Sequence, residues 1–331
     1  MKIKQITAGG YFAAALTNDG KVVGWGYNTY GQLGNNSTTN MGYPVYMKKE
    51  VEVIDSDGNV TKELQDLDNI IQISAGTSHI LAVDKNGNVW ATGLNNYGQL
   101  GINVASTSSG NENYKRAYAV KVQKQIEVTS EDGTVSTSLV DLDNVKLVSG
   151  GGDFSTALLN DGTVVAWGLG TYGQIGNNAA QTVYVPQAVN NLTDVVDIDS
   201  GAFQTIALKN DGTVWAWGIN HYGNLGINSA STTTSNAAYK KVVPVQVLKG
   251  ASDPLTNVKK VSSLNETSYA LLNDGSVYGW GLNTSGQIGD NTIVNKSVAT
   301  LVLEAGGAPL KGIQTLCEGQ YTNTNIMIDE Y

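Results

Sequence analysis

Short apolar segments alternate with polar turns along the chain, and the same order of segments returns five times. In each copy an alternating segment such as Ile70-Ile71-Gln72-Ile73 precedes an apolar segment such as Ile80-Leu81-Ala82-Val83. A turn of the type Asn-Asp-Gly follows, then a segment with Val and Trp-Gly, and then a sequence such as Tyr-Gly-Gln-Leu-Gly. Asn, Asp and Gly tolerate the positive φ that tight hairpin turns require. The pattern therefore predicts antiparallel strands joined by hairpins.

The turn glycines set the period of the repeat. They are Gly20, Gly87, Gly162, Gly212 and Gly275. Their spacing runs from 50 residues (162 to 212) to 75 residues (87 to 162). A period of this size, built from short strands, is typical of propeller blades. A fourth strand is expected at segments such as Tyr43-Pro44-Val45-Tyr46, because an edge strand can spare the N–H that proline lacks. We predict an all-β propeller of four-stranded blades.

The two ends of the chain match the same half of the repeat. The N-terminus begins on a first strand, and 313–316 with 325–328 match strands one and two of a sixth copy. We therefore expect five full repeats plus a half repeat, in six sectors or seven, within one domain of residues 1–331. Two insertions, near 51–66 and 124–141, match each other, and each predicts an extra hairpin. Two polar insertions, 103–116 and 228–241, predict surface loops.

Composition narrows the classes of function. The net charge of −9 disfavours binding to nucleic acid or to an anionic membrane. The single cysteine, Cys317, excludes an internal disulfide and a cysteine-based zinc site, and it is expected to be a small buried side chain. No apolar run is long enough to cross a membrane. Because Met1-Lys2-Ile3-Lys4 leads into a strand, we expect no signal peptide, cytoplasmic synthesis, and a later place in a virion or released particle.

The repeated residues resemble the regulator of chromosome condensation repeat. The second half of that unit is matched by 210–220, which read Asn-Asp-Gly-Thr-Val-Trp-Ala-Trp-Gly-Ile-Asn, and by Gly223-Asn224-Leu225-Gly226. The resemblance covers nearly the whole chain and implies a propeller, usually of seven blades. It implies a bacterial or phage member, whose relatives include enzyme-inhibitory propellers and surface repeat proteins. Eukaryotic members act as nucleotide-exchange factors or chromatin binders. The histidine that recurs in the family is present only at His79.

The sequence offers little that could perform catalysis. Its two histidines, His79 and His221, lie in different repeats, so they make a weak metal site. His79 falls at a structural position of the family, and His221 is expected to be exposed in a loop. The recurring carboxylates are interpreted as turn formers; they are Asp19, Asp161, Asp211 and Asp274. We therefore expect neither an enzyme nor a bound cofactor or metal.

Equivalent tyrosines are the most distinctive candidate for binding. Tyr30, Tyr97, Tyr172 and Tyr222 follow the Trp-Gly segment at the same place, whereas the fifth copy has Ser285. Equivalent positions form a circle in a propeller, and tyrosine is enriched at binding surfaces. The alternative is that these rings pack between blades. Together with His221, the four tyrosines are the candidate partner-binding residues.

Three roles follow, in decreasing order of preference. The first is a non-catalytic structural or protein-interaction propeller in a bacterial or phage assembly, docking to a protein partner or to other subunits. The alternative is a regulatory binder of an enzyme or small GTPase, as an inhibitor or a nucleotide-exchange factor. A weaker alternative is a disc that binds a glycan or receptor. None of these roles involves nucleic acid or insertion into a membrane.

Overall fold

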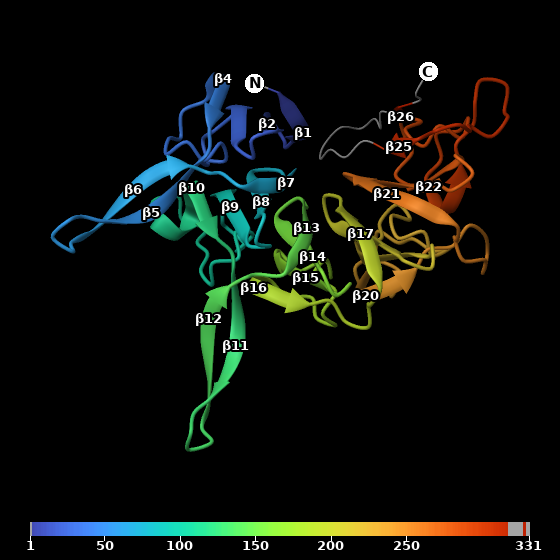
Figure 1. The fold of residues 1–331 in the computed structure, drawn as a ribbon. Helices are drawn as coiled ribbons and strands as arrows, with labels where there is room; N and C mark the ends of the chain where they lie inside the picture. The colour runs from blue at the N-terminus through green and yellow to red at the C-terminus, as the bar shows by residue number, and fades with distance from the viewer. Residues whose placement is uncertain (1, 317–326, 329–331) are drawn as a thin grey trace.

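Five antiparallel sheets stand around a common centre in the computed structural model, which describes residues 2–316 and 327–328 (Figure 1). Each blade runs from an inner to an outer strand. Blade 1 is β1 (Ile3–Ala8), β2 (Phe12–Thr17), β3 (Val22–Gly26) and β4 (Met41–Tyr46); blade 2 is β7 (Ile70–Ala75), β8 (His79–Asp84), β9 (Val89–Leu94) and β10 (Lys115–Lys121); blade 3 is β13 (Val145–Gly150), β14 (Phe154–Leu159), β15 (Val164–Gly168) and β16 (Val183–Ala188); blade 4 is β17 (Val195–Ser200), β18 (Gln204–Lys209), β19 (Val214–Ile219) and β20 (Lys240–Gln246); blade 5 is β21 (Val258–Leu264), β22 (Thr267–Leu272), β23 (Val277–Gly281) and β24 (Lys296–Leu301).

The predicted all-β propeller with five complete blades is confirmed. A further pair of short strands, β25 (Thr315–Leu316) and β26 (Met327–Ile328), matches the start of the expected sixth copy. The first part of that copy's predicted second strand, residues 325–326, and Cys317 lie outside the described residues. In the part of the chain that the structure describes, no helix is long and apolar enough to span a membrane.

The hairpin turns use aspartate as the sequence suggests. In blade 4, Asp211 Oδ1 accepts hydrogen bonds from the backbone N–H of Thr213 at 2.9 Å and from its hydroxyl at 2.6 Å. These bonds from Thr213 lower the pKa of Asp211. Gly212 follows at φ +80°, which suits glycine. Asp161 and Asp274 accept equivalent bonds from Thr163 and Ser276. These carboxylates therefore stabilise the hairpin turns in which they lie.

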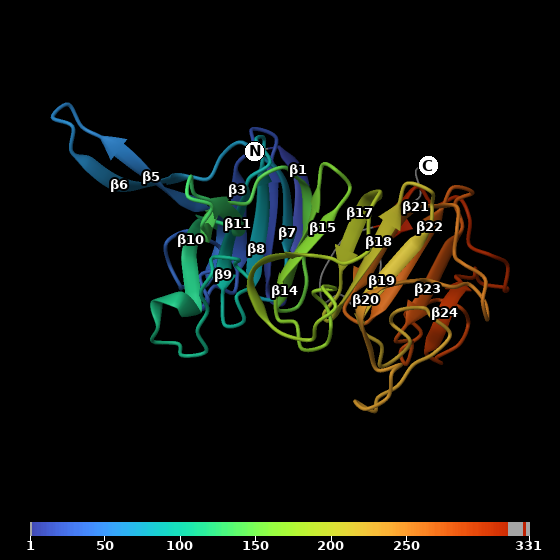
Figure 2. The same ribbon diagram turned by 90° about the horizontal axis from the view of Figure 1, so that it is seen from below.

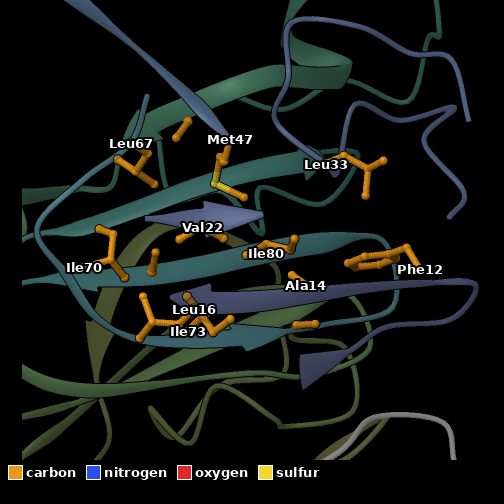
Figure 3. Packing of buried hydrophobic residues seen from close by; sticks show 13 residues of the cluster. Phe12, Ala14, Leu16, Val22, Leu33, Met47, Leu67, Ile70, Ile73 and Ile80 are labelled. Carbon is orange, nitrogen blue, oxygen red and sulfur yellow. The ribbon is translucent and has the colours of Figure 1, made fainter. Parts of the chain in front are cut away.

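Neighbouring blades are joined by apolar seams. Figure 3 shows the seam between blades 1 and 2, where Leu16 and Val22 of blade 1 pack with Ile70 and Ile73 of blade 2. The third-strand tryptophans Trp167, Trp217 and Trp280 are fully buried in the later seams. Each donates its indole N–H at 2.9 Å to a carbonyl of the preceding blade, on Gln99, Gln174 and Asn224 respectively. The tryptophans therefore fix the blades to one another as well as filling the core.

Side chains of the inner strands also bond across the seams. Gln5 donates to the Ile73 carbonyl at 2.9 Å and accepts from the Ile73 N–H at 3.0 Å. Gln72 makes the same two bonds to Val148, each at 3.0 Å. The inner strands come so close that a Cβ on Gly150 would lie 2.5 Å from the backbone nitrogen of Gly76. Glycine is therefore required there by proximity.

Two hairpins project from the rim of the disc (Figure 1), and the first of them also stands out in Figure 2. Arm 1 consists of β5 (Lys48–Ile54) and β6 (Val60–Asp66), and arm 2 of β11 (Gln123–Thr129) and β12 (Val135–Asp141). Both lie where the sequence predicts insertions. Arm 1 joins the sheet of blade 2 through a parallel bridge between Lys49 and Ala119, so that this sheet has six strands. Arm 2 forms a sheet of its own.

The ring is open beside blade 1 in the described structure. The first strand of each later blade contacts the blade before it, whereas no blade precedes blade 1 among the described residues (Figure 1). Ile6 is 61% exposed, although its equivalent Ile73 is 1% exposed. The core therefore consists of the seams between successive blades, and it ends at blade 1.

Candidate binding face

One face of the disc carries the candidate tyrosines. In an antiparallel blade, the turn between the first two strands and the loop between the last two leave from the same end. We call this end of the disc the loop face. A buried asparagine organises the loop in every blade except blade 3, which has Gly170 there: Asn28 accepts from the Leu33 N–H at 2.9 Å and donates to the carbonyls of Ser37 and Thr39. Asn95 and Asn220 do the same in their blades.

The glutamine of the repeated loop holds the neighbouring tyrosine. Gln32 accepts a hydrogen bond from the backbone N–H of Tyr30 at 3.1 Å, and Gln99 accepts one from Tyr97 at 2.9 Å. Gln32 and Gln99 are buried, while Tyr30 and Tyr97 are half-buried. The motif thus fixes the backbone of each tyrosine and leaves part of its ring at the surface.

Tyr30 belongs to a chain of four aromatic rings, which we call cluster 1. Tyr11, Tyr27, Tyr30 and Tyr114 meet edge to face in that order, with centroids 6.3, 5.9 and 6.1 Å apart. Tyr11, at one end, is 86% exposed. Burial raises the pKa of Tyr30, so its hydroxyl stays protonated at neutral pH. These rings present a broad surface that is both apolar and hydrogen-bonding, which is typical of protein-binding hot spots.

A second group of rings, cluster 2, lies two blades further on. Tyr172 meets Phe203 at 5.2 Å, and His221 meets Tyr239 at 4.7 Å and Tyr222 at 6.0 Å. Contrary to the sequence expectation, His221 is half-buried, and burial lowers its pKa. His221 is therefore neutral at pH 7, which suits a place among aromatic rings.

The two remaining loops differ. Tyr97 has no aromatic neighbour within the described residues, and the fifth copy offers Ser285. The equivalent tyrosines therefore do not form a continuous circle: Tyr30 lies in cluster 1, Tyr172 and Tyr222 in cluster 2, and Tyr97 in neither. Two acidic residues also face this side from first turns: Asp153, whose carboxyl oxygen accepts from Gln99 at 3.3 Å, and Glu266. Burial raises the pKa of both carboxyls.

The polar insertions complete the clusters, and the sequence analysis missed this role. The loop before β10 supplies Tyr114, and the loop before β20 supplies Tyr239. In both loops the lysine after the tyrosine reaches the preceding blade: Lys115 donates to the Thr29 carbonyl at 3.0 Å and Lys240 to the Thr171 carbonyl at 2.8 Å. The available signal was the Tyr-Lys pair shared by two loops that otherwise differ.

The second histidine, His79, lies inside the protein and not on the loop face. His79 is fully buried, and its Nε2 lies 3.0 Å from the Ser155 hydroxyl of blade 3. Burial lowers the pKa of His79 to about 3. Among residues 2–316 and 327–328, no three side chains of His, Cys, Asp or Glu gather in a way that could hold a metal ion.

Known proteins share both the sequence pattern and the fold. A family profile described as RCC1-like domain matches residues 1–322. Human E3 ubiquitin-protein ligase HERC2 is 30% identical over 300 residues, which is 90% of this chain and 5% of HERC2. The human regulator of chromosome condensation is 24% identical over 87% of this chain and 62% of its own length. The chain thus spans less than two thirds of these curated relatives.

Two solved structures show the same fold. Human WBSCR16 aligns with a TM-score of 0.66 and 21% identity, covering 98% of this chain and 71% of that one. Yeast Prp20p, from Saccharomyces cerevisiae, aligns with a TM-score of 0.58 and 20% identity, covering 92% of this chain and 77% of that one. At this level of identity the likeness concerns the fold alone.

Proposed function

Because the chain belongs to the RCC1-like domain family, we propose that it is a non-catalytic propeller that binds a protein partner through its loop face and regulates that partner. The observation that carries the proposal is the pair of aromatic clusters on one face. Partly exposed rings on a rigid frame bury apolar area on binding at small entropic cost.

The relatives favour regulation over assembly. Yeast Prp20p, whose fold the chain shares, is described by its binding to Gsp1p and histones, and it has been solved with Kap60. We carry over only the binding of proteins by the propeller, with an enzyme or small GTPase as the proposed kind of partner. A role in a bacterial or phage particle rests on composition and on the open ring. A glycan is a weaker ligand for this face, because the tyrosines do not form a continuous circle.

Capture from a lysate of the source organism tests the proposal. The immobilised chain should retain a protein that a Tyr11→Ser, Tyr27→Ser double variant loses, since cluster 1 would lose half its rings. Tyr43→Ser is the matched control, because Tyr43 is 67% exposed on outer strand β4. The captured protein's enzymatic or nucleotide-exchange rate is then measured with and without the chain. Equal capture by the wild-type chain, the double variant and Tyr43→Ser contradicts the proposal. So does a rate of the captured protein that the chain leaves unchanged.

A further inference from the structure

Strand β12 of arm 2 leaves one edge open. Within the described residues it pairs only with β11. Beside the turn, the Ser130 N–H donates to the Thr134 carbonyl. Antiparallel ladders alternate between bonded and non-bonded pairs, so the N–H and C=O groups of Val135, Thr137 and Leu139 point away from β11. These groups form a row to which another strand could bond.

This edge lacks the protection found elsewhere in the molecule. Residues 135–140 read Val-Ser-Thr-Ser-Leu-Val, without a charge or a proline. The outer strands of blades 1, 3 and 4 each contain a proline, and β24 is at least half-buried throughout. Arm 1 has Lys62 at the position equivalent to Thr137, paired with Glu50 at 2.7 Å. Charges and prolines are the usual means of blocking strand addition, so β12 is an unguarded edge.

Both sides of arm 2 expose apolar side chains. Val135 and Leu139 are 59% and 41% exposed on one side, and Ile126 and Val128 are 37% and 39% exposed on the other. A two-stranded ribbon is marginally stable alone in water. A third strand would satisfy the open backbone groups and cover apolar surface on both sides.

The negative charge of arm 2 indicates which kind of strand would pair with β12. Residues 123–141 contain one basic residue, Lys124, and four acidic residues, Glu127, Glu131, Asp132 and Asp141, which is a net charge of −3. Pairing of β12 with the same strand of a second copy would bring two such arms together. A basic strand would instead be attracted, and the whole chain, at −9, adds to that preference.

We propose that β12 receives an extended segment of a partner protein, in which Lys or Arg alternates with β-branched apolar residues, as a third strand of arm 2. This inference goes beyond the proposed function, because arm 2 lies on the rim, away from the aromatic clusters. The main-chain bonds would supply affinity, and the alternating side chains would supply selectivity.

The test uses the full chain and a synthetic peptide, acetyl-Lys-Val-Lys-Val-Lys-Val-Lys-amide, labelled with a fluorophore. A peptide with Glu in place of Lys tests charge, and one that is N-methylated at every residue tests main-chain bonding. We expect the first to bind and the other two to bind at least about tenfold more weakly. Amide exchange should slow at Val135, Thr137 and Leu139 when the first peptide binds.

Thr137→Pro removes one outward N–H without breaking a bond to β11, so the hairpin should persist while binding falls at least about tenfold. Thr137→Val is the matched control and should bind normally. Exchange at the β11 amides shows whether the hairpin is intact. Equal binding by Thr137→Pro, no protection of β12, or a dimer that pairs through β12 overturns the proposal. Peptide binding that is lost in the Tyr11, Tyr27 variant also overturns it, whereas capture through the loop face is judged separately.

Discussion

The same residue types lie in opposite surroundings in blade 1 and in the later blades. Ile6 is 61% exposed, whereas the residues at its position in blades 2 to 5, Ile73, Val148, Ile198 and Val261, are at most 4% exposed. Trp25 is half-buried, while Trp167, Trp217 and Trp280 are fully buried. Burial at these positions therefore comes from the preceding blade, and the repeat pattern alone does not determine it.

The largest expected difference concerns the tryptophans. Trp217→Ala should lower the free energy of unfolding by about 3–5 kcal/mol, because it leaves a large cavity in a seam and removes the bond to Gln174. Trp25→Ala should cost about 1 kcal/mol or less, since Trp25 is only half-buried and no blade precedes it among the described residues. Denaturant unfolding of the full chain measures both. Similar losses for the two variants would show that the open side is covered in solution.

A smaller effect of the same kind is expected for the inner strands. Ile73→Ala should cost about 2–4 kcal/mol and Ile6→Ala about 0.5 kcal/mol, because only Ile73 is packed within a seam. Thermal or denaturant unfolding gives the difference. An equal cost at Ile6 would contradict the description of an open face.

The buried histidine, His79, makes the free energy of unfolding depend on pH. The pKa of His79 falls to about 3 in the folded chain, against 6.5 for the ordinary group. Below pH 6.5 the unfolded chain binds a proton that the folded chain does not, so stability falls as the pH falls. Between pH 7 and pH 5 this loss is about 2 kcal/mol.

His79→Phe should remove that part of the loss, because Phe12 and Phe154 occupy the same position in other blades. Unfolding of both proteins at pH 7 and pH 5 measures it, and the carboxylates cancel in the difference. His221→Phe is the control at a half-buried site. An equal pH dependence for wild type and His79→Phe would mean that the imidazole can be charged in place.

The smallest effect concerns the hydrogen bonds of the inner strands. Gln72→Leu should cost about 1–2 kcal/mol, since it leaves the N–H and C=O of Val148 without the Gln72 side chain. Blade 3 already has Leu147 at this position, so the leucine side chain itself is accommodated by the fold. Denaturant unfolding of the wild-type chain and of Gln72→Leu measures the difference. If Gln72→Leu does not lower the free energy of unfolding, apolar packing alone stabilises this seam.

The strands could be predicted because each lies between local turn signals. Asn, Asp and Gly fix the hairpins wherever the repeat occurs, and the alternation of apolar residues sets the buried side. The clusters could not be predicted in the same way. Tyr114 and Tyr239 come from insertions outside the repeat, and His221 is half-buried because Tyr239 covers it. Such neighbours depend on how the blades stand in space, which periodicity does not encode.

Among the described residues the blades form an open series, in which each blade packs only on its neighbours in the sequence. Each inner blade shares two seams with its neighbours, while blade 1 shares one (Figure 1). In such a series, cooperativity passes only between adjacent members, so unfolding should spread inward from an end. Blade 1 stands at one end of the series, so we expect unfolding to begin there. A partner bound to its tyrosines would stabilise blade 1 and, through it, the blades that follow.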